Sequence, residues 1–326
     1  MPLLQPKAKP VTATASKGRA KRRYVIIPVI ILGLIFAAYS VLWMQGAKLM
    51  KQSVADFVSD EQAAGHLVEM KRVRIKGYPF TLSAQIDDFT WSDPSEWSWS
   101  GEKLFIVTLP YDPSRLIFVP RGPQNVRVGT SSYDIIADTL RVGLEAGNFS
   151  AETQGLSTIS EEGQLALGDL KANLIQNEDG TWILGAAVRD LVTTMQDRSP
   201  VTTHFWNIAA SGDVATPQKA TIDATELALS DGMTTPPAVV KLNGHIGIDH
   251  ANYPEGKLNL SIRNYQILVE LLEQQNLLSQ DDLASIKPTL DAFANTGNDE
   301  IALPFTLRQG KLSMAGLPIA DLPKIR

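Results

Sequence analysis

The segment FTLSAQID, residues 80–87, alternates apolar and polar side chains over its whole length. Its apolar positions are Phe80, Leu82, Ala84 and Ile86, and its polar positions are Thr81, Ser83, Gln85 and Asp87. Successive side chains of a β-strand point to opposite faces, so a period of two places all the apolar side chains on one face. The segment therefore predicts a half-buried strand in a sheet that is apolar on one face only.

The same alternation returns late in the chain, in residues 257–263 and again in residues 301–308. Turn-forming pairs separate such segments, including Asp93-Pro94, Asp112-Pro113, Gly122-Pro123, Asp231-Gly232 and Gln309-Gly310. Short turns between successive strands are typical of an antiparallel meander. Near Gly168 the apolar positions shift phase, which predicts a β-bulge and a curved sheet.

Between these last two strands the apolar period becomes helical. Leu268, Leu271 and Leu272 predict a first helix. Ser279 is a candidate N-cap of a second helix, and Pro288 should kink this helix. The apolar stripe of the second helix is Leu283, Ile286, Leu290 and Phe293. The predicted fold class is therefore α+β, mostly antiparallel β, with a long curved meandering sheet and a late helical pair.

Upstream of the strands, residues 24–44 read YVIIPVIILGLIFAAYSVLWM and contain no charged side chain. At a rise of 1.5 Å per residue such a helix matches a hydrocarbon core about 30 Å thick. Tyr24 and Trp43 lie at its two ends, where aromatic rings favour the headgroup layer. The segment predicts a transmembrane helix, with the lipid bilayer as its partner. A cleaved signal peptide is the alternative, although the apolar run continues past the cleavage-like Ala38-Tyr39-Ser40.

The predicted span divides the chain into regions of different character. Residues 1–23 form a basic tail with seven cations and no acid, which predicts a cytoplasmic N-terminus. Residues 45–66 carry apolar side chains at near-helical spacing and predict a juxtamembrane helical stalk. Residues 67–326 form an exported β-rich domain, with a candidate boundary between two halves near residue 200.

Charge and composition exclude several classes of function. The net charge of the chain is −5, which leaves −12 for the part that follows the basic tail. An acidic domain is a poor match to nucleic acid, whose binding requires a basic surface. The chain has no cysteine, which excludes disulfides, thiolate metal sites and a cysteine nucleophile.

No catalytic signature stands out in the sequence. It contains no phosphate-binding glycine-rich loop, no Gly-x-Ser-x-Gly elbow and no His-Glu-x-x-His helix. Its four histidines are scattered, at His66, His204, His245 and His250. We therefore expect no metal site, no cofactor, no catalytic residue and no enzymatic activity.

Two local motifs are unusual. Trp97 and Trp99 are two residues apart, so a strand places them on one face, where they either line an apolar groove or form part of the core. In Gly77-Tyr78-Pro79-Phe80, Pro79 cannot donate to a strand ladder and holds the residue before it extended. We interpret this second motif as structural, starting or bending a strand at an edge.

Several of these motifs resemble an uncharacterised family of membrane-anchored bacterial envelope proteins, the domain of unknown function 2125. The resemblance rests on the basic tail and single span, and on residues 73–80, Trp97-Ser98-Trp99 and Pro110-Tyr111-Asp112-Pro113. It also rests on the C-terminal segments LPFTL (303–307) and GLPI (316–319) through Leu322-Pro323. It implies an anchor in the bacterial inner membrane and a periplasmic domain. The family has no assigned activity to carry over.

The strand-rich organisation behind one N-terminal anchor is also similar, as a fold analogy, to envelope proteins of the AsmA type, which are associated with lipid traffic and outer-membrane assembly. The leading hypothesis is therefore that the curved sheet binds lipid or another apolar molecule near Trp97 and Trp99. The alternative is a non-enzymatic scaffold or assembly partner for another envelope protein.

Overall fold

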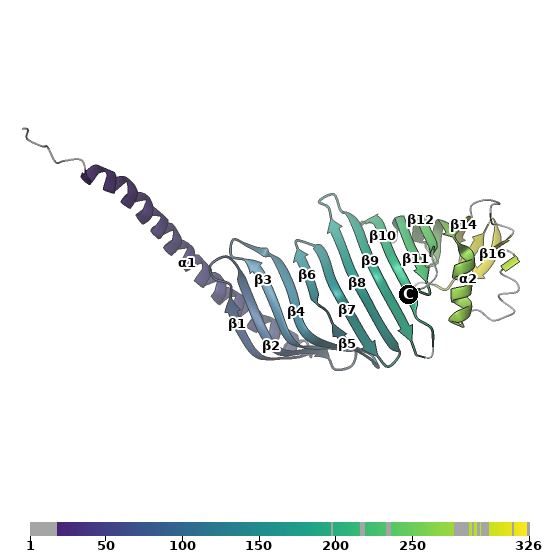
Figure 1. Ribbon diagram of the computed structural model, residues 1–326, viewed down its shortest axis with the longest axis horizontal. Helices are drawn as coiled ribbons and strands as arrows, with labels where there is room; N and C mark the ends of the chain where they lie inside the picture. Colours follow the sequence, from purple (N-terminus) through teal and green to yellow (C-terminus); the bar gives the residue numbers. More distant parts are fainter. Residues whose placement is uncertain are drawn as a thin grey trace, which may run out of the picture.

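The computed structural model describes residues 18–196, 198–215, 219–232, 236–276, 287–288, 290–291, 294, 300–314 and 316–324. Over these residues the protein has a long N-terminal helix, one 16-stranded antiparallel sheet and a second helix near the end of the sheet (Figure 1). The helices are α1 (Gly18–Ala63) and α2 (Tyr265–Gln274). The first eight strands are β1 (Leu67–Lys76), β2 (Leu82–Asp93), β3 (Trp97–Leu109), β4 (Asp112–Val128), β5 (Ser131–Ile136), β6 (Thr139–Glu145), β7 (Asn148–Ser160) and β8 (Gly163–Gln176). The others are β9 (Thr181–Met195), β10 (Val201–Asp213), β11 (Lys219–Ser230), β12 (Ala238–Ile248), β13 (Pro254–Arg263), β14 (Glu300–Arg308), β15 (Lys311–Met314) and β16 (Leu317–Asp321).

Helix α1 joins the predicted transmembrane helix and the predicted stalk into one uninterrupted helix of 46 residues. It begins at Gly18, so the last part of the predicted basic tail is helical as well. Gly65, with a φ of +95°, allows the chain to turn from the helix into β1. No residue in the most apolar stretch of α1 is buried against the described protein, and by length and composition this helix can cross a membrane. Figure 1 shows it projecting beyond the sheet.

The sheet is a meander in which strands that follow each other in the chain lie side by side. The exception is local: β5 and β6 both lie between β4 and β7, β5 on one half of these strands and β6 on the other. They act as one strand interrupted at residues 137–138. The candidate boundary near residue 200 falls in the turn between β9 and β10, which pair along their whole length.

The register gathers the cross-strand ion pairs on one face of the sheet. Lys241 pairs with Glu226, whereas its neighbour Val240 points to the other face, opposite Ile262. Other cross-strand ion pairs on the charged face are Arg115–Glu145, Lys171–Glu152 and Arg263–Glu300. One face is therefore polar and wet, and the other is an apolar face that needs cover.

The strand predicted from residues 80–87 is confirmed from Leu82 onward and wrong at Phe80. Leu82, Ala84 and Ile86 are buried in β2. Phe80 lies outside the strand with 78% of its surface exposed. The reason is a turn that alternation does not reveal: the Thr81 amide donates to the Gly77 carbonyl over 2.9 Å and closes the chain before β2 begins.

The predicted bulge near Gly168 is also corrected. Strand β8 keeps a single register with both β7 and β9 on either side of Gly168, so no residue is inserted. The residues that face it on these neighbours, Gly155 and Asp190, have φ values of +57° and +52°. The shift in the apolar positions near Gly168 therefore does not come from a bulge in one strand. It occurs at register-matched residues of three neighbouring strands, β7, β8 and β9.

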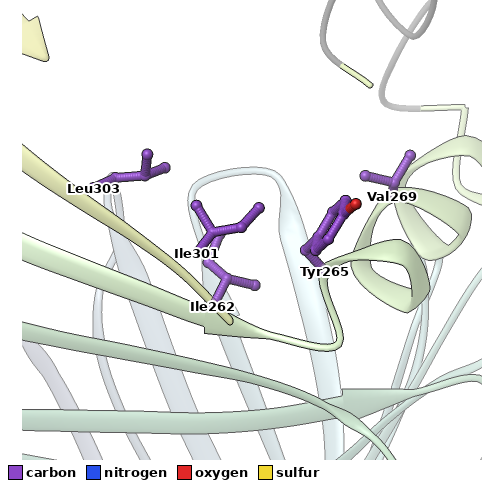
Figure 2. Close-up of a cluster of buried hydrophobic side chains, with 5 residues drawn as sticks. All are labelled: Ile262, Tyr265, Val269, Ile301 and Leu303. Atoms are coloured by element: carbon purple, nitrogen blue, oxygen red, sulfur yellow. The ribbon is translucent and has the colours of Figure 1, made fainter. Parts of the chain in front are cut away.

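At the far end of the sheet, α2 covers the apolar face of β12 to β14. Figure 2 shows the buried cluster there, in which Tyr265 and Val269 of α2 face Ile262, Ile301 and Leu303 of the strands. The first predicted late helix is therefore confirmed. Of the second, residues 287–288 and 290–291 are helical, and Leu290 packs on this cluster; Ser279, Leu283, Ile286 and Phe293 lie outside the described residues.

The cluster in Figure 2 predicts a large effect of removing its central side chain. Ile301 is fully buried, so Ile301→Ala should lower the free energy of unfolding by about 3 kcal/mol through lost burial and a cavity. Ile159→Ala, at an exposed position of β7, should change it by less than about 0.5 kcal/mol. Urea unfolding followed by circular dichroism measures both values. Equal effects of the two substitutions would contradict this placement of the core.

Candidate functional site

An apolar cleft of about 490 Å³ lies between helix α1 and the apolar face of the first four strands. Among the described residues that line it, none is charged. From α1 these are Gly46, Leu49, Met50, Ser53, Val54 and Phe57. From β1 to β4 and their turns they are Met70, Leu82, Ile86, Phe89, Thr90, Trp91, Trp99, Leu104, Ile106, Thr108, Pro110, Pro113, Leu116 and Phe118. Its volume falls within the range of small-molecule sites, about 300–1,000 Å³.

The helical wall of the cleft is one stripe of α1. Gly46, Met50, Ser53 and Phe57 recur every three or four residues, so a helix places them on the same side. Helix and sheet approach closely at Gly46, where a Cβ atom would lie 2.8 Å from Cδ1 of Leu82. The cleft therefore begins where α1 meets β2, two residues after the end of the uncharged segment 24–44.

The sheet side of the cleft is a packed floor. Ile86, Phe89 and Leu104 form a buried cluster beneath it. The ring of Trp99 stands edge-on to Phe89 at 4.8 Å between centroids, and its Nε1 donates to Oε1 of Gln124 over 3.2 Å. These contacts fix the indole, so the floor is preformed rather than assembled by a ligand.

Above the cleft, α1 is held by the loop between β1 and β2, residues 77–81; we call this contact the upper attachment. The hydroxyl of Tyr39 donates to the carbonyl of Pro79 over 2.5 Å, and Nε1 of Trp43 donates to the carbonyl of Thr81 over 2.9 Å. The hydroxyls of Ser40 and Tyr78 share a hydrogen bond of 2.8 Å. The peptide bond between Tyr78 and Pro79 is cis.

Below the cleft, the last turns of α1 contact β2 and the residues that follow the helix. We call this contact the lower attachment. Oε2 of Glu61 accepts from Nε1 of Trp91 over 2.9 Å and lies 2.7 Å from Nδ1 of His66. The hydrogen bond with His66, and then the one from Trp91, hold the pKa of Glu61 below its usual value. The ring of Phe57 stands edge-on to Trp91 at 5.3 Å. Helix α1 is thus attached at two levels, and the cleft is the space between them.

The cleft also opens onto an apolar row that crosses the sheet. Leu116 lines the cleft, and its register partners on the next strands are Leu144 of β6 and then Phe149 of β7. The row continues through Leu174 of β8 to Leu184 of β9. Leu144 and Phe149 are exposed although both lie on the apolar face. No described element covers this part of the row, in contrast to the parts of the apolar face that lie under α1 and α2.

Of the site residues predicted from the sequence, only some lie at the cleft. Trp99 lines the cleft, as does Trp91. Trp97 shares the face of Trp99 but packs on the ring of Trp91, with 5.1 Å between centroids, and does not line the cleft. The Gly77–Phe80 motif does not line it either; it forms the loop of the upper attachment.

Sequence reasoning missed the part of the site that comes from α1 and from β4. The helical spacing of residues 45–66 was visible, but not which side of that helix meets the sheet. The signal that marks the correct side is the pair of small residues Gly46 and Ser53, which allow close approach and leave free volume.

A second, larger hollow of about 910 Å³ lies at the ends of β9 to β14. Its lining includes Asp213, Lys219, Glu255, Lys257 and Arg308, so water and ions solvate it well. Within the described part of the chain, no group of three histidine or acidic side chains gathers in a way that could hold a metal ion. The uncharged cleft is therefore the better candidate for a specific ligand.

Fold and site together define a protein with one apolar N-terminal helix, a single meandering sheet and an apolar cleft between them. The chain belongs to the family described as "Uncharacterized protein conserved in bacteria (DUF2125)", which matches residues 43–323. This confirms the resemblance drawn from the sequence motifs. No curated protein and no solved structure matches the chain. Both attachments of α1 and the cleft involve residues inside the matched range.

The lower attachment predicts a pH-dependent stability. Because the pKa of Glu61 is lower in the folded protein, its contribution is fully present above the usual value of 4.5 and is lost as the pH falls through the lowered value. Glu61→Gln should therefore lower the Tm of the full chain in lipid nanodiscs at pH 7, and this difference should shrink progressively as the pH falls below 4.5. The control Glu96→Gln, at an exposed turn, should leave the Tm unchanged. A difference between native and Glu61→Gln protein that does not shrink at the lower pH would contradict this role.

Proposed function

We propose that this protein is anchored by α1 in the bacterial inner membrane, with its N-terminus in the cytoplasm and its sheet in the periplasm, and that it binds lipid acyl chains in the cleft between α1 and β1 to β4. The observation that carries the proposal is the position of an uncharged cleft directly after an uncharged helical segment. A lipid is the apolar molecule that such a position makes available.

The anchor is supported by the distribution of charge along the N-terminal part of the chain. Residues 24–44 carry no charge, the most apolar stretch of α1 is exposed, and seven cations precede it. An exposed apolar helix of this length is unfavourable in water and favourable in a bilayer, and cations next to a span favour the cytoplasmic side.

The lipid ligand is supported by the lining and by energetics. The hydrophobic contribution applies to lipid taken up from water, because a chain that enters from the bilayer leaves one apolar medium for another. Each methylene moved from water into an apolar site contributes about 0.8 kcal/mol. Ten methylenes would thus contribute about 8 kcal/mol, which is comparable with the ordering cost of binding, about 4–15 kcal/mol. Further methylenes along the row from Leu116 to Phe149 would make binding favourable. The site therefore suits a chain longer than the cleft alone would hold.

The proposed activity is binding rather than catalysis. The cleft offers hydroxyl groups from Ser53, Thr90 and Thr108 but no titratable side chain among the described residues that line it. Acid–base or nucleophilic chemistry on a bound lipid would require such a group.

The alternative, a scaffold for another envelope protein, is supported by a different part of the molecule. Strand β16 is the last strand of the sheet, all of its residues are exposed, and Leu317 and Ile319 are among them. An unpaired strand edge of this kind can pair with a strand of another chain. One stoichiometric partner crosslinked to β16 in intact cells, with no lipid in the cleft, would favour this alternative.

The orientation of the anchor predicts the result of a topology experiment. An enzyme that is active only outside the cytoplasm, fused after Arg326, should be active, because the sheet follows the span on the exported side. The same enzyme fused after residue 23 should be inactive, since that fusion lacks the apolar segment. Activity of the second fusion, or inactivity of a stably produced first one, would refute the proposed orientation.

The lipid site predicts a selective loss of labelling when the cleft is filled. Full-length protein in vesicles made with a phospholipid that carries a diazirine near the end of its acyl chain should be labelled in the peptides that contain Ile86 and Trp99. Ser53→Trp should remove most of this labelling, because the indole would occupy the cleft. Gln52→Trp places the same side chain one residue away, outside the lining, and should retain it.

Peptide mass spectrometry reads out the labelling, and circular dichroism checks that each variant is folded. Unlabelled native protein would refute the proposed site. So would equal labelling of cleft peptides in Ser53→Trp and Gln52→Trp.

A further inference from the structure

The loop between β1 and β2, residues 77–81, contacts α1 at an unexpected level. Its partners in the upper attachment are Tyr39, Ser40 and Trp43, and the ring of Tyr78 also stands edge-on to Phe36, at 6.1 Å between centroids. All of these residues belong to the uncharged segment 24–44 rather than to the stalk that follows it. The loop therefore lies beside the part of α1 that the proposed anchor places in the membrane.

The helical rise sets how far the loop reaches along the span. From Phe36 to Trp43 the helix axis advances about 10 Å, at 1.5 Å per residue. With segment 24–44 across a hydrocarbon core about 30 Å thick, this stretch is its last third on the exported side. A loop fixed to this stretch lies among lipids of the outer leaflet and not in the water beyond them.

The chemistry of the loop suits that environment. Its sequence, Gly77-Tyr78-Pro79-Phe80-Thr81, contains no charge, and the side chains of Phe80 and Tyr78 are 78% and 46% exposed. In water an exposed phenylalanine ring is unfavourable, whereas at the membrane interface aromatic rings are favoured.

Three backbone carbonyls of the loop have hydrogen-bond partners within the protein. The carbonyl of Gly77 accepts from the Thr81 amide, that of Pro79 accepts from Tyr39, and that of Thr81 accepts from Trp43. Non-helical backbone is tolerated at membrane depth only where protein groups satisfy it. Proline contributes no amide donor that would need a partner.

We propose that loop 77–81 is inserted into the outer leaflet beside α1, with the ring of Phe80 in contact with lipid acyl chains. This inference rests on the anchoring part of the proposed function and does not require that the cleft bind lipid. The loop leads directly into Leu82. This residue lines the cleft and lies next to Gly46 of α1. The inserted loop therefore directly precedes, in the chain, a residue that lines the cleft.

The absence of cysteine from the chain allows a direct test with single-cysteine variants. Each variant of the full chain carries an environment-sensitive NBD fluorophore and is reconstituted in phospholipid vesicles with the sheet outside. Phe80→Cys reports on the loop. Leu34→Cys, at an exposed position in the middle of the apolar segment, reports on the anchor, and Glu96→Cys, in the turn at the opposite end of β2, reports on a position in water.

The fluorophores at positions 80 and 34 should both show blue-shifted emission and protection from externally added dithionite. The fluorophore at position 96 should show neither. Because Phe80 has little contact with the rest of the protein, its replacement should not disturb folding, and circular dichroism verifies this.

The two proposals fail in different ways. A protected probe at position 34 with an unprotected probe at position 80 would overturn the inserted loop and leave the anchor in place. An unprotected probe at position 34 would overturn the anchor and the inserted loop together. Unlabelled cleft peptides in the diazirine experiment, with positions 34 and 80 both protected, would refute lipid binding in the cleft but not the inserted loop.

Discussion

The apolar face of a single open sheet is the constraint on which the rest of this structure depends. A meander of strands with alternating side chains has one face that water solvates well and one that it does not. With no second sheet among the described elements, the apolar face is covered by helices: α1 over β1 to β4 and α2 over β12 to β14. The middle of the sheet, around Leu144 and Phe149, keeps apolar side chains exposed.

The cover provided by α1 differs from that provided by α2. Helix α2 is short and close to the sheet, and it completes a buried cluster around Ile301. Helix α1 is long, and hydrogen bonds hold it to the loop between β1 and β2 at one level and to β2 at another, with the cleft between these levels. Polar groups make both contacts specific: the Pro79 and Thr81 carbonyls above, and Glu61 below. The apolar cleft lies between these two contacts, and its proximity to the uncharged segment is the basis on which lipid binding is proposed.

Local sequence patterns predicted the class of the fold and many of its elements. The alternation in residues 82–86, 257–263 and 301–308 and the helical period after residue 264 all correspond to elements of the structure. The errors occur where a tertiary contact overrides the local pattern. Phe80 continues an apolar alternation but is displaced by a turn that α1 holds. At Gly168 the phase shift is shared by β7, β8 and β9, which one strand's sequence cannot reveal.

The sequence by itself determined that an uncharged helical segment precedes a one-sided antiparallel sheet, because charge, length and side-chain period are local properties. It also determined that Trp97 and Trp99 share a strand face. Only the tertiary structure decided that Trp99 lines a cleft while Trp97 packs on Trp91, and that Gly46 and Ser53 form the opposite wall. The physical reason is that a cleft is the volume left between two elements. Its position depends on where α1 crosses the sheet, which the Glu61 and Tyr39 contacts fix and no periodicity encodes.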